Sequence, residues 1–402
     1  MKNKKRFDLE GKIWEFVDNH TYFVFFALIT FLAIVVRYLL IKYPSGDYDM
    51  FLKPWFDELK AYGGLAGLAR DIGNYSPIYM TILACLTYFP VDSVISIKIV
   101  SIIFELIGGI FLIKIIYEIF KDKKSKETIA LIVYGIYLFL PTVFLNSAFW
   151  AQSDAIYTCF VIISLYYLIK KRYLRGIIFW AIAFSFKFQA IFVFPLLVLI
   201  YFADRKIKFK YFLTIPATIF ILSIPKVLFC GDILVGFKFY TNQVGTYSDY
   251  LTLNLPNIYS IYFKNEGYSN LIQTPLKELG TIGVIFTLTL FIIIAFVVLK
   301  KKIKFDNKAI IEFALWSILI CNFFLPQMHE RYLFMADVIG IVYLFMNRKK
   351  FYIPLAIEMI SLNGYMYLLF SGFAINLSYL SIFFFVILLI YTKDMYIKYF
   401  KN

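Results

Sequence analysis

The sequence is poor in charged residues, histidine and cysteine. Only 17% of its 402 residues are Asp, Glu, Lys or Arg, whereas 61% are hydrophobic and 21% aromatic. The four cysteines show no metal-ligand spacing and indicate neither a zinc site nor a disulfide framework. This composition excludes an ordinary soluble domain, and no internal repeat or polar linker divides the chain. We therefore expect one membrane domain over residues 1–402.

Apolar runs about as long as a bilayer is thick recur along the chain, and each spanning helix needs about 20 such residues. They predict an all-α, polytopic transmembrane helical bundle of about 11–13 helices. The stretch 176–202 is too short for two full spans, so it predicts a hairpin of two short helices that turns near Lys187 and Gln189. The other helices are expected at about 21–41, 95–120, 128–148, 155–169, 211–229, 279–299, 309–326, 332–347, 351–370 and 372–391.

The net charge of +15 is distributed as in a membrane protein and does not indicate a nucleic-acid partner. Basic residues concentrate in seven short stretches, which the positive-inside rule places in the cytoplasm. Both termini, 1–20 and 392–402, are then cytoplasmic, the first helix is uncleaved, and 42–93 and 231–278 are long outer loops. The seven stretches are 1–20, 121–127, 170–175, 203–210, 300–308, 348–352 and 393–402.

The first outer loop contains an amphipathic stretch, 51–69, with apolar residues at helical spacing. Such a helix lies in the membrane interface or covers the bundle, and the pattern leaves both open.

Polar residues beside the predicted helices fall on the outer side, where each is costly unless it has a partner or a function. They form five groups: Gly46–Asp49, Asn74–Pro77, Trp150–Asp154, Lys187 and Met328–Tyr332.

Asp47 and Asp49 follow the first helix at a spacing of two, so their side chains diverge and do not form a carboxylate dyad. One of them suits a general base while the other anchors the loop. Alternatively, both cap the amphipathic helix or meet lipid headgroups.

His329, Glu330 and Arg331 end a predicted helix and combine groups that suit a phosphate, since a guanidinium binds phosphate through two parallel hydrogen bonds. The alternative is an outward interfacial cluster. Lys187 lies inside an apolar hairpin and needs an anion, which either Asp154 or a ligand phosphate supplies.

Three of these motifs resemble those of the GT-C membrane glycosyltransferases. Gly46-Asp47-Tyr48-Asp49 is similar to the Gly-Asp-Tyr-(Asp/Glu) element of the polyprenyl-phosphate-sugar-dependent glucosyl- and mannosyltransferases of N-glycan and GPI-anchor assembly. Trp150–Asp154 and Met328–Tyr332 look like the other two signatures of the GPI-mannosyltransferase-like branch. The resemblance covers about residues 20 to 350, and it implies inverting transfer of a hexose from a polyprenyl phosphate to an acceptor hydroxyl on the extracytoplasmic face.

The resemblance also implies roles for single residues. Asp47 is the catalytic base and Asp49 a helper, while the departing donor phosphate needs the charge of Lys187, His329 and Arg331. Side chains expected to bind substrate are Trp55, Tyr75, Trp150, Gln152, Asp154 and Glu330. We expect no metal or other cofactor, although a divalent cation at Asp47 and Asp49 is an alternative.

The partners so implied are the lipid-linked sugar donor, a glycan or glycolipid acceptor and the bilayer. The chain lacks the extracytoplasmic C-terminal domain of some relatives, which argues against a protein acceptor. Its Lys- and Ile-rich composition indicates a bacterial plasma membrane, an undecaprenyl carrier and a role in the cell envelope. Two alternatives are a flippase or transporter of lipid-linked saccharides, which would place polar residues nearer the midplane, and a GT-C polymerase or ligase.

Overall fold

The structure is a computed structural model that describes residues 9–204, 206–246, 250–262, 271–273, 277–371 and 375–401. Parts of the expected segments 1–20, 203–210, 231–278 and 392–402 lie outside the described residues, as does the expected start of the helix at 372–391.

The described chain is almost entirely helical. Its first half contains α1 (Leu9–Asn19), α2 (Thr21–Leu40), α3 (Lys53–Ala61), α4 (Pro77–Leu86), α5 (Ser93–Ile119), α6 (Lys126–Phe139), α7 (Pro141–Phe144), α8 (Asp154–Ile169), α9 (Tyr173–Phe186) and α10 (Phe194–Ala203). Its second half contains α11 (Thr214–Cys230), α12 (Val235–Thr246), α13 (Ile258–Tyr262), α14 (Lys277–Lys301), α15 (Asn307–Phe324), α16 (Phe334–Met346), α17 (Tyr352–Phe370) and α18 (Leu377–Met395). Short 3-10 or π turns are η1 (Tyr48–Leu52), η2 (Gly64–Ala69), η3 (Leu145–Phe149), η4 (Phe188–Val193), η5 (Phe209–Leu213), η6 (Arg348–Lys350) and η7 (Tyr396–Phe400).

The helix lengths confirm an all-α, polytopic membrane protein. Among the described residues, 7 helical segments are long and apolar enough to cross a membrane, and a bent pair over 126–149 makes up to 8. Shorter apolar helices, which include α8, α9 and α16, pack beside them. These shorter helices need not span the bilayer by themselves, because most of their side chains are buried against neighbouring helices.

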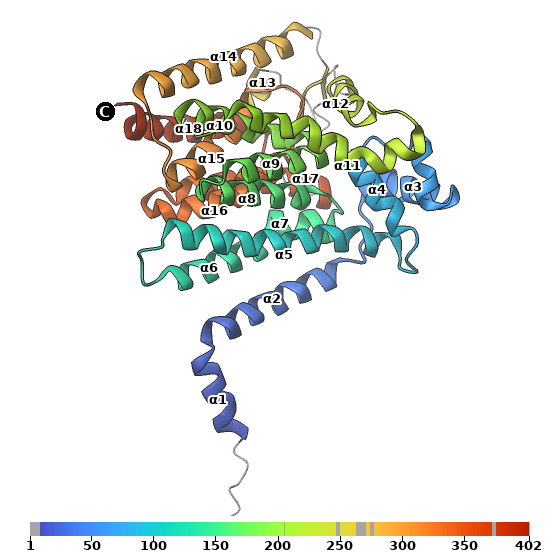
Figure 1. The fold of residues 1–402 in the computed structure, drawn as a ribbon, viewed down its shortest axis with the longest axis horizontal. Coiled ribbons are helices and arrows are strands. Elements are labelled where there is room, and N and C mark those ends of the chain that lie inside the picture. The colour runs from blue at the N-terminus through green and yellow to red at the C-terminus, as the bar shows by residue number, and fades with distance from the viewer. Residues whose placement is uncertain are drawn as a thin grey trace, which may run out of the picture.

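The long helices run roughly side by side, so the connections gather at the two ends of the bundle (Figure 1). One end carries α3, α4 and α12, and we call it the α3–α4 end. The opposite end carries the basic loop between α5 and α6 and the C-terminus. The first two helices extend away from the bundle, and α2 meets it mainly through α6 and η3.

Two expected helices are interrupted, each for a local reason. The amphipathic stretch 51–69 is divided into η1, α3 and η2, because Gly63 adopts the left-handed conformation (φ 81°), which glycine tolerates and which ends α3. The helix expected at 128–148 ends at Phe139, because Pro141 cannot continue it, and the chain bends by 50° into α7 and η3.

The hairpin expected at 176–202 breaks at Lys187 as predicted, with extended backbone between α9 and η4. Within the expected outer loop 42–93, α4 is an additional apolar helix that begins at Ser76 and Pro77. The stretch 231–278 was predicted only as a long loop, and the described part of it contains two short strands. It contributes β1 (Tyr250–Leu253) and β2 (Leu271–Gln273), and β1 also pairs in parallel with β3 (Met328–His329), giving the order β2-β1-β3.

A buried ion pair fixes the end of α2 near the α3–α4 end. Arg37 Nε donates to Glu105 Oε2 of α5 at 2.7 Å, and both side chains are almost fully buried. Arg37 also donates to the backbone oxygens of Ala33 and Leu138, so the guanidinium is well satisfied away from water. This contact sets the direction in which the chain leaves α2 toward Asp47.

Candidate functional site

A cavity of about 250 Å³ lies at the α3–α4 end. Its walls come from the segment after α2, α3, the segment before α4, the segment after η3, the break between α9 and η4, α12 and the segment before α16. Nine of the expected site residues line it: Asp47, Trp55, Tyr75, Trp150, Gln152, Lys187, His329, Glu330 and Arg331.

Asp47 presents a carboxylate whose two oxygens have different surroundings. The Trp150 indole N–H and the Gln152 amide both donate to Oδ2, at 3.0 Å and 2.6 Å. Among the described residues no side chain or backbone group donates to Oδ1, and Asp47 is half-buried in the cavity wall. One oxygen is therefore held while the other is available to accept a proton from a ligand.

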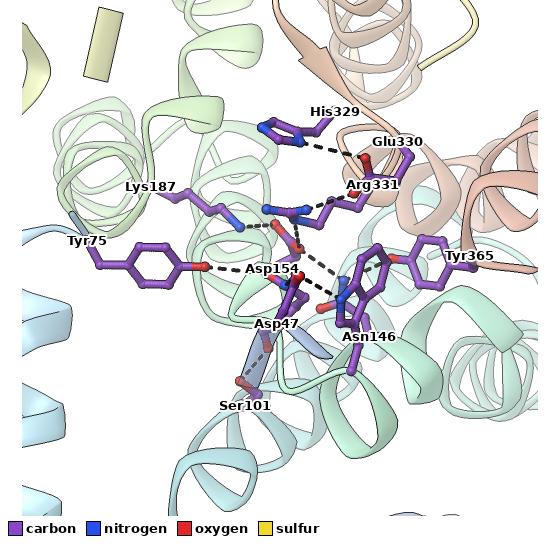
Figure 2. A network of polar contacts seen from close by, with 12 residues as sticks. Asp47, Tyr75, Ser101, Asn146, Asp154, Lys187, His329, Glu330, Arg331 and Tyr365 are labelled. Atoms are coloured by element: carbon purple, nitrogen blue, oxygen red, sulfur yellow. Dashed lines mark hydrogen bonds and ion pairs between the residues drawn. The ribbon is translucent and has the colours of Figure 1, made fainter. Parts of the chain in front are cut away.

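The convergence of two donors on one oxygen depends on the backbone of Ala151. Ala151 is buried and has a φ of 68°, in the left-handed region that alanine rarely adopts. This turn between Trp150 and Gln152 points both side chains toward Asp47 (Figure 2 shows the surrounding network). Strained backbone of this kind persists only where the surroundings hold it, which occurs often at functional sites.

Two cations line the same cavity as Asp47 and are anchored by a buried carboxylate. Lys187 Nζ donates to Asp154 Oδ1 at 2.6 Å, and Arg331 Nε lies 3.7 Å from Asp154 Oδ2 (Figure 2). Asn146 donates to the same Oδ2 at 3.0 Å. Since an ammonium has three N–H donors and a guanidinium five, these contacts orient the cations and leave other donors for an anion in the cavity.

Glu330 and His329 form the next layer beside Arg331. Arg331 Nη1 donates to Glu330 Oε1 at 2.7 Å, and His329 Nδ1 lies 3.6 Å from Glu330 Oε2. Burial alone would raise the pKa of Glu330, but its contacts with His329 and Arg331 lower that pKa to about 2. Burial lowers the pKa of His329. The contact with Glu330 raises that pKa, but Arg331 and Lys187 lower it further, so the net shift is downward and the imidazole is neutral at neutral pH.

The pairing of β1 with β3 positions the segment that carries His329, Glu330 and Arg331. Leu251 accepts from the backbone N–H of Gln327 at 2.8 Å, and Leu253 accepts from that of Glu330 at 3.1 Å. Asn254, which follows β1, pairs with His329 and lines the cavity with a φ of 67°. The long loop therefore both holds the segment before α16 and adds an amide to the cavity wall.

Aromatic side chains cover the remaining walls. Tyr75 packs edge-on against Trp55, with ring centres 5.3 Å apart, and its hydroxyl donates to Gln152 Oε1 at 3.4 Å. Trp150 is buried, lies edge-on to Tyr365, and has the Arg331 guanidinium 5.5 Å from its ring centre. The cavity thus combines flat apolar faces, which suit a sugar ring, with charged groups.

Two expected site residues lie elsewhere. Asp49 is exposed and does not line the cavity, and Asp154 is fully buried beneath the cations, where it supplies the anion that Lys187 needs. Among the described residues, no three His, Cys, Asp or Glu side chains gather as ligands of a metal ion.

Three residues in or beside the cavity were not predicted from the sequence: Asn146, Asn254 and Tyr365. Asn146 donates to both Asp154 and Tyr365 from within η3. A buried polar residue in an expected helix is a signal that singles out Asn146, but nothing local pairs it with Tyr365.

The chain is distantly similar to a known enzyme. It is 26% identical over 193 residues to GPI mannosyltransferase 1 of Saccharomyces cerevisiae. The match covers 48% of this chain and 45% of the yeast protein, so the matched region spans about half the length of each. No protein-family model matches the sequence. This weak homology and the long apolar helices agree with the resemblance to the GT-C glycosyltransferases.

Proposed function

We propose that the protein is a membrane glycosyltransferase that transfers a hexose from a polyprenyl phosphate to an acceptor hydroxyl. The reaction takes place in the cavity at the α3–α4 end, on the extracytoplasmic face, with inversion at the anomeric carbon. The observation that carries this proposal is the placement of one free carboxylate oxygen of Asp47 in the same cavity as Lys187 and Arg331.

The proposed reaction is a single displacement. The acceptor oxygen attacks the anomeric carbon while its proton passes to Asp47 Oδ1. The bond between the anomeric carbon and the phosphate oxygen breaks on the opposite face of the sugar, and its electron pair leaves with the polyprenyl phosphate. Inversion follows because base and leaving group stand on opposite faces.

The leaving phosphate gains charge as the bond breaks, so it needs fixed donors more than a proton. Lys187 and Arg331 supply them. Lys187 donates one N–H to Asp154, while Arg331 contacts Glu330 and Asp154, and the remaining N–H groups of both cations serve the phosphate. His329, neutral at neutral pH, acts in this proposal as a hydrogen-bonding neighbour rather than a third positive charge. The scheme requires no metal or other cofactor.

The position of the cavity supports a lipid-linked donor. Its wall includes the apolar side chains Phe186, Phe188 and Leu368 beside the polar groups, so a sugar phosphate has charged contacts while its prenyl chain stays in the bilayer. The basic loop between α5 and α6 lies at the opposite end of the bundle, which supports an outward-facing site under the positive-inside rule. Mannose is the first donor sugar to test, because the similar yeast protein is a mannosyltransferase.

The test uses the full chain in proteoliposomes with undecaprenyl- and dolichyl-phosphate sugars and total envelope lipid and glycan as acceptor. Release of polyprenyl phosphate is measured for the wild type, for Asp47→Asn and for Asp57→Asn. Asp57 is the matched control because it lies close in sequence, is exposed and pairs with Lys53 on the surface of α3.

We expect release by the wild type and by Asp57→Asn, and a loss of about 1,000-fold or more in Asp47→Asn, because the base is removed. Equal release by all three would remove Asp47 from the mechanism. Movement of the intact donor across the bilayer without release would replace the transferase by a flippase.

A further inference from the structure

Lys98 is a buried cation that the proposed mechanism does not use. It lies in α5, one of the helices long enough to cross a membrane, and its side chain is 0% exposed. Among the described residues its ammonium contacts no carboxylate. It donates instead to two backbone oxygens, at 2.5 Å to Tyr43 and at 3.0 Å to Phe149. A lysine is costly at such a position, which indicates a specific role.

The two carbonyl groups belong to the two chain segments that meet at Asp47. Tyr43 lies in the segment that leaves α2 and leads to Asp47, while Phe149 directly precedes Trp150. One ammonium therefore joins the segment that carries the proposed base to the segment that carries its hydrogen-bond donors.

Hydrogen bonds from two hydroxyl groups hold the backbone on both sides of Ala151. Ser101, one helical turn after Lys98, donates to the backbone oxygen of Gln152 at 2.9 Å. Ser45 donates to the backbone oxygen of Trp150 at 2.6 Å. The strained turn at Ala151 thus has its flanking carbonyl groups held from α5 and from the segment before Asp47.

We propose that Lys98 is a positioning residue for Asp47. By fixing the Tyr43 and Phe149 carbonyl groups relative to each other, it keeps the Trp150 and Gln152 donors within reach of Asp47 Oδ2. It does not line the cavity and contacts no reacting group. This inference rests on the proposed function, and a misplacement of about 1 Å of a reacting group is enough to cost about 100-fold in rate.

The first test compares Lys98→Met with Lys114→Met, the same substitution at an exposed lysine of the same helix. In Lys98→Met we expect faster amide hydrogen exchange confined to peptides that cover 42–52 and 146–155. We also expect a fall in kcat of about 10- to 100-fold with the KM for the donor changed less than about 2-fold. Lys114→Met should match the wild type, and Lys98→Arg should recover part of kcat, because it keeps the buried donor.

Unchanged exchange in both segments, or faster exchange along the whole chain together with a higher KM, would overturn the proposal in favour of a general structural role. The exchange measurement does not require activity. If the wild type transfers no sugar, the proposed function fails, while the exchange of the two segments still decides whether Lys98 holds them.

A double substitution tests the route by which Lys98 acts. If it acts through the segment of Gln152, then Lys98→Met combined with Gln152→Leu should lower kcat no further than the more severe single substitution. If kcat of the double variant falls by the product of the two single decreases, Lys98 does not act through this segment, and the inference is overturned.

Discussion

Asp154 is the buried anion that anchors both cations of the cavity, and its substitution tests the electrostatics of the site. The carboxylate is 0% exposed, accepts from Lys187 at 2.6 Å and from Asn146 at 3.0 Å, and lies 3.7 Å from Arg331. Asp154→Asn keeps the shape of the side chain and removes its charge. Breaking a buried ion pair by removing one partner costs about 3–5 kcal/mol, because the other charge stays buried without compensation.

Thermal unfolding in detergent measures this loss. Because the unfolding entropy is about 2.1 cal/mol/K per residue, a loss of this size in a chain of 402 residues should lower the midpoint by roughly 4–6 °C. Asp306→Asn is the matched control, because Asp306 also stands at the start of a helix and accepts from Ala309 N at 2.7 Å, but is exposed. Asparagine caps a helix as well as aspartate does, so this control should melt like the wild type.

A double variant separates stability from catalysis. In Asp154→Asn with Lys187→Met no unpaired ammonium remains, so most of the lost stability should return, while sugar transfer should stay low because the donor phosphate loses Lys187. If Asp154→Asn melts like the wild type, or if the double variant melts below Asp154→Asn, then Asp154 does not stabilise the fold by compensating the buried charge of Lys187.

Three further predictions concern the segment Trp150–Gln152 and His329. Trp150→Phe and Gln152→Leu each remove one donor to Asp47 and should each lower kcat about tenfold or more, as measured in the release assay. At Ala151, where φ is 68°, glycine should leave the thermal midpoint nearly unchanged, whereas valine should cost about 2 kcal/mol. Because burial lowers the pKa of His329, the unfolded chain takes up this proton first as pH falls below about 6.5; the wild-type midpoint should therefore fall more steeply toward pH 5 than that of His329→Gln.

The helices and the gathering of polar residues at one end of the bundle could be predicted from the sequence, because both follow from the cost of placing polar groups in a bilayer. Nine expected residues come together in one cavity for this reason. The division of 176–202 into two short helices followed from length, since the stretch is too short for two spans, and the break lies at Lys187.

The detailed geometry could not be predicted. The left-handed turn at Ala151 has no local signal, because alanine rarely adopts it and only the surrounding contacts hold it there. The pairing of Leu253 with His329 joins segments far apart in sequence, which periodicity does not reveal. Likewise, spacing alone left open whether Asp154 or a ligand would pair with Lys187.

The configuration of the new glycosidic linkage reports whether the sugar is transferred in a single displacement. With an undecaprenyl-phosphate hexose of known anomeric configuration, NMR of the product made by the reconstituted wild type reports whether that configuration has changed. Displacement between Asp47 on one face of the sugar and Lys187 and Arg331 on the other predicts an inverted linkage. A retained linkage would require a covalent sugar intermediate and would exclude Asp47 as the base of a single displacement.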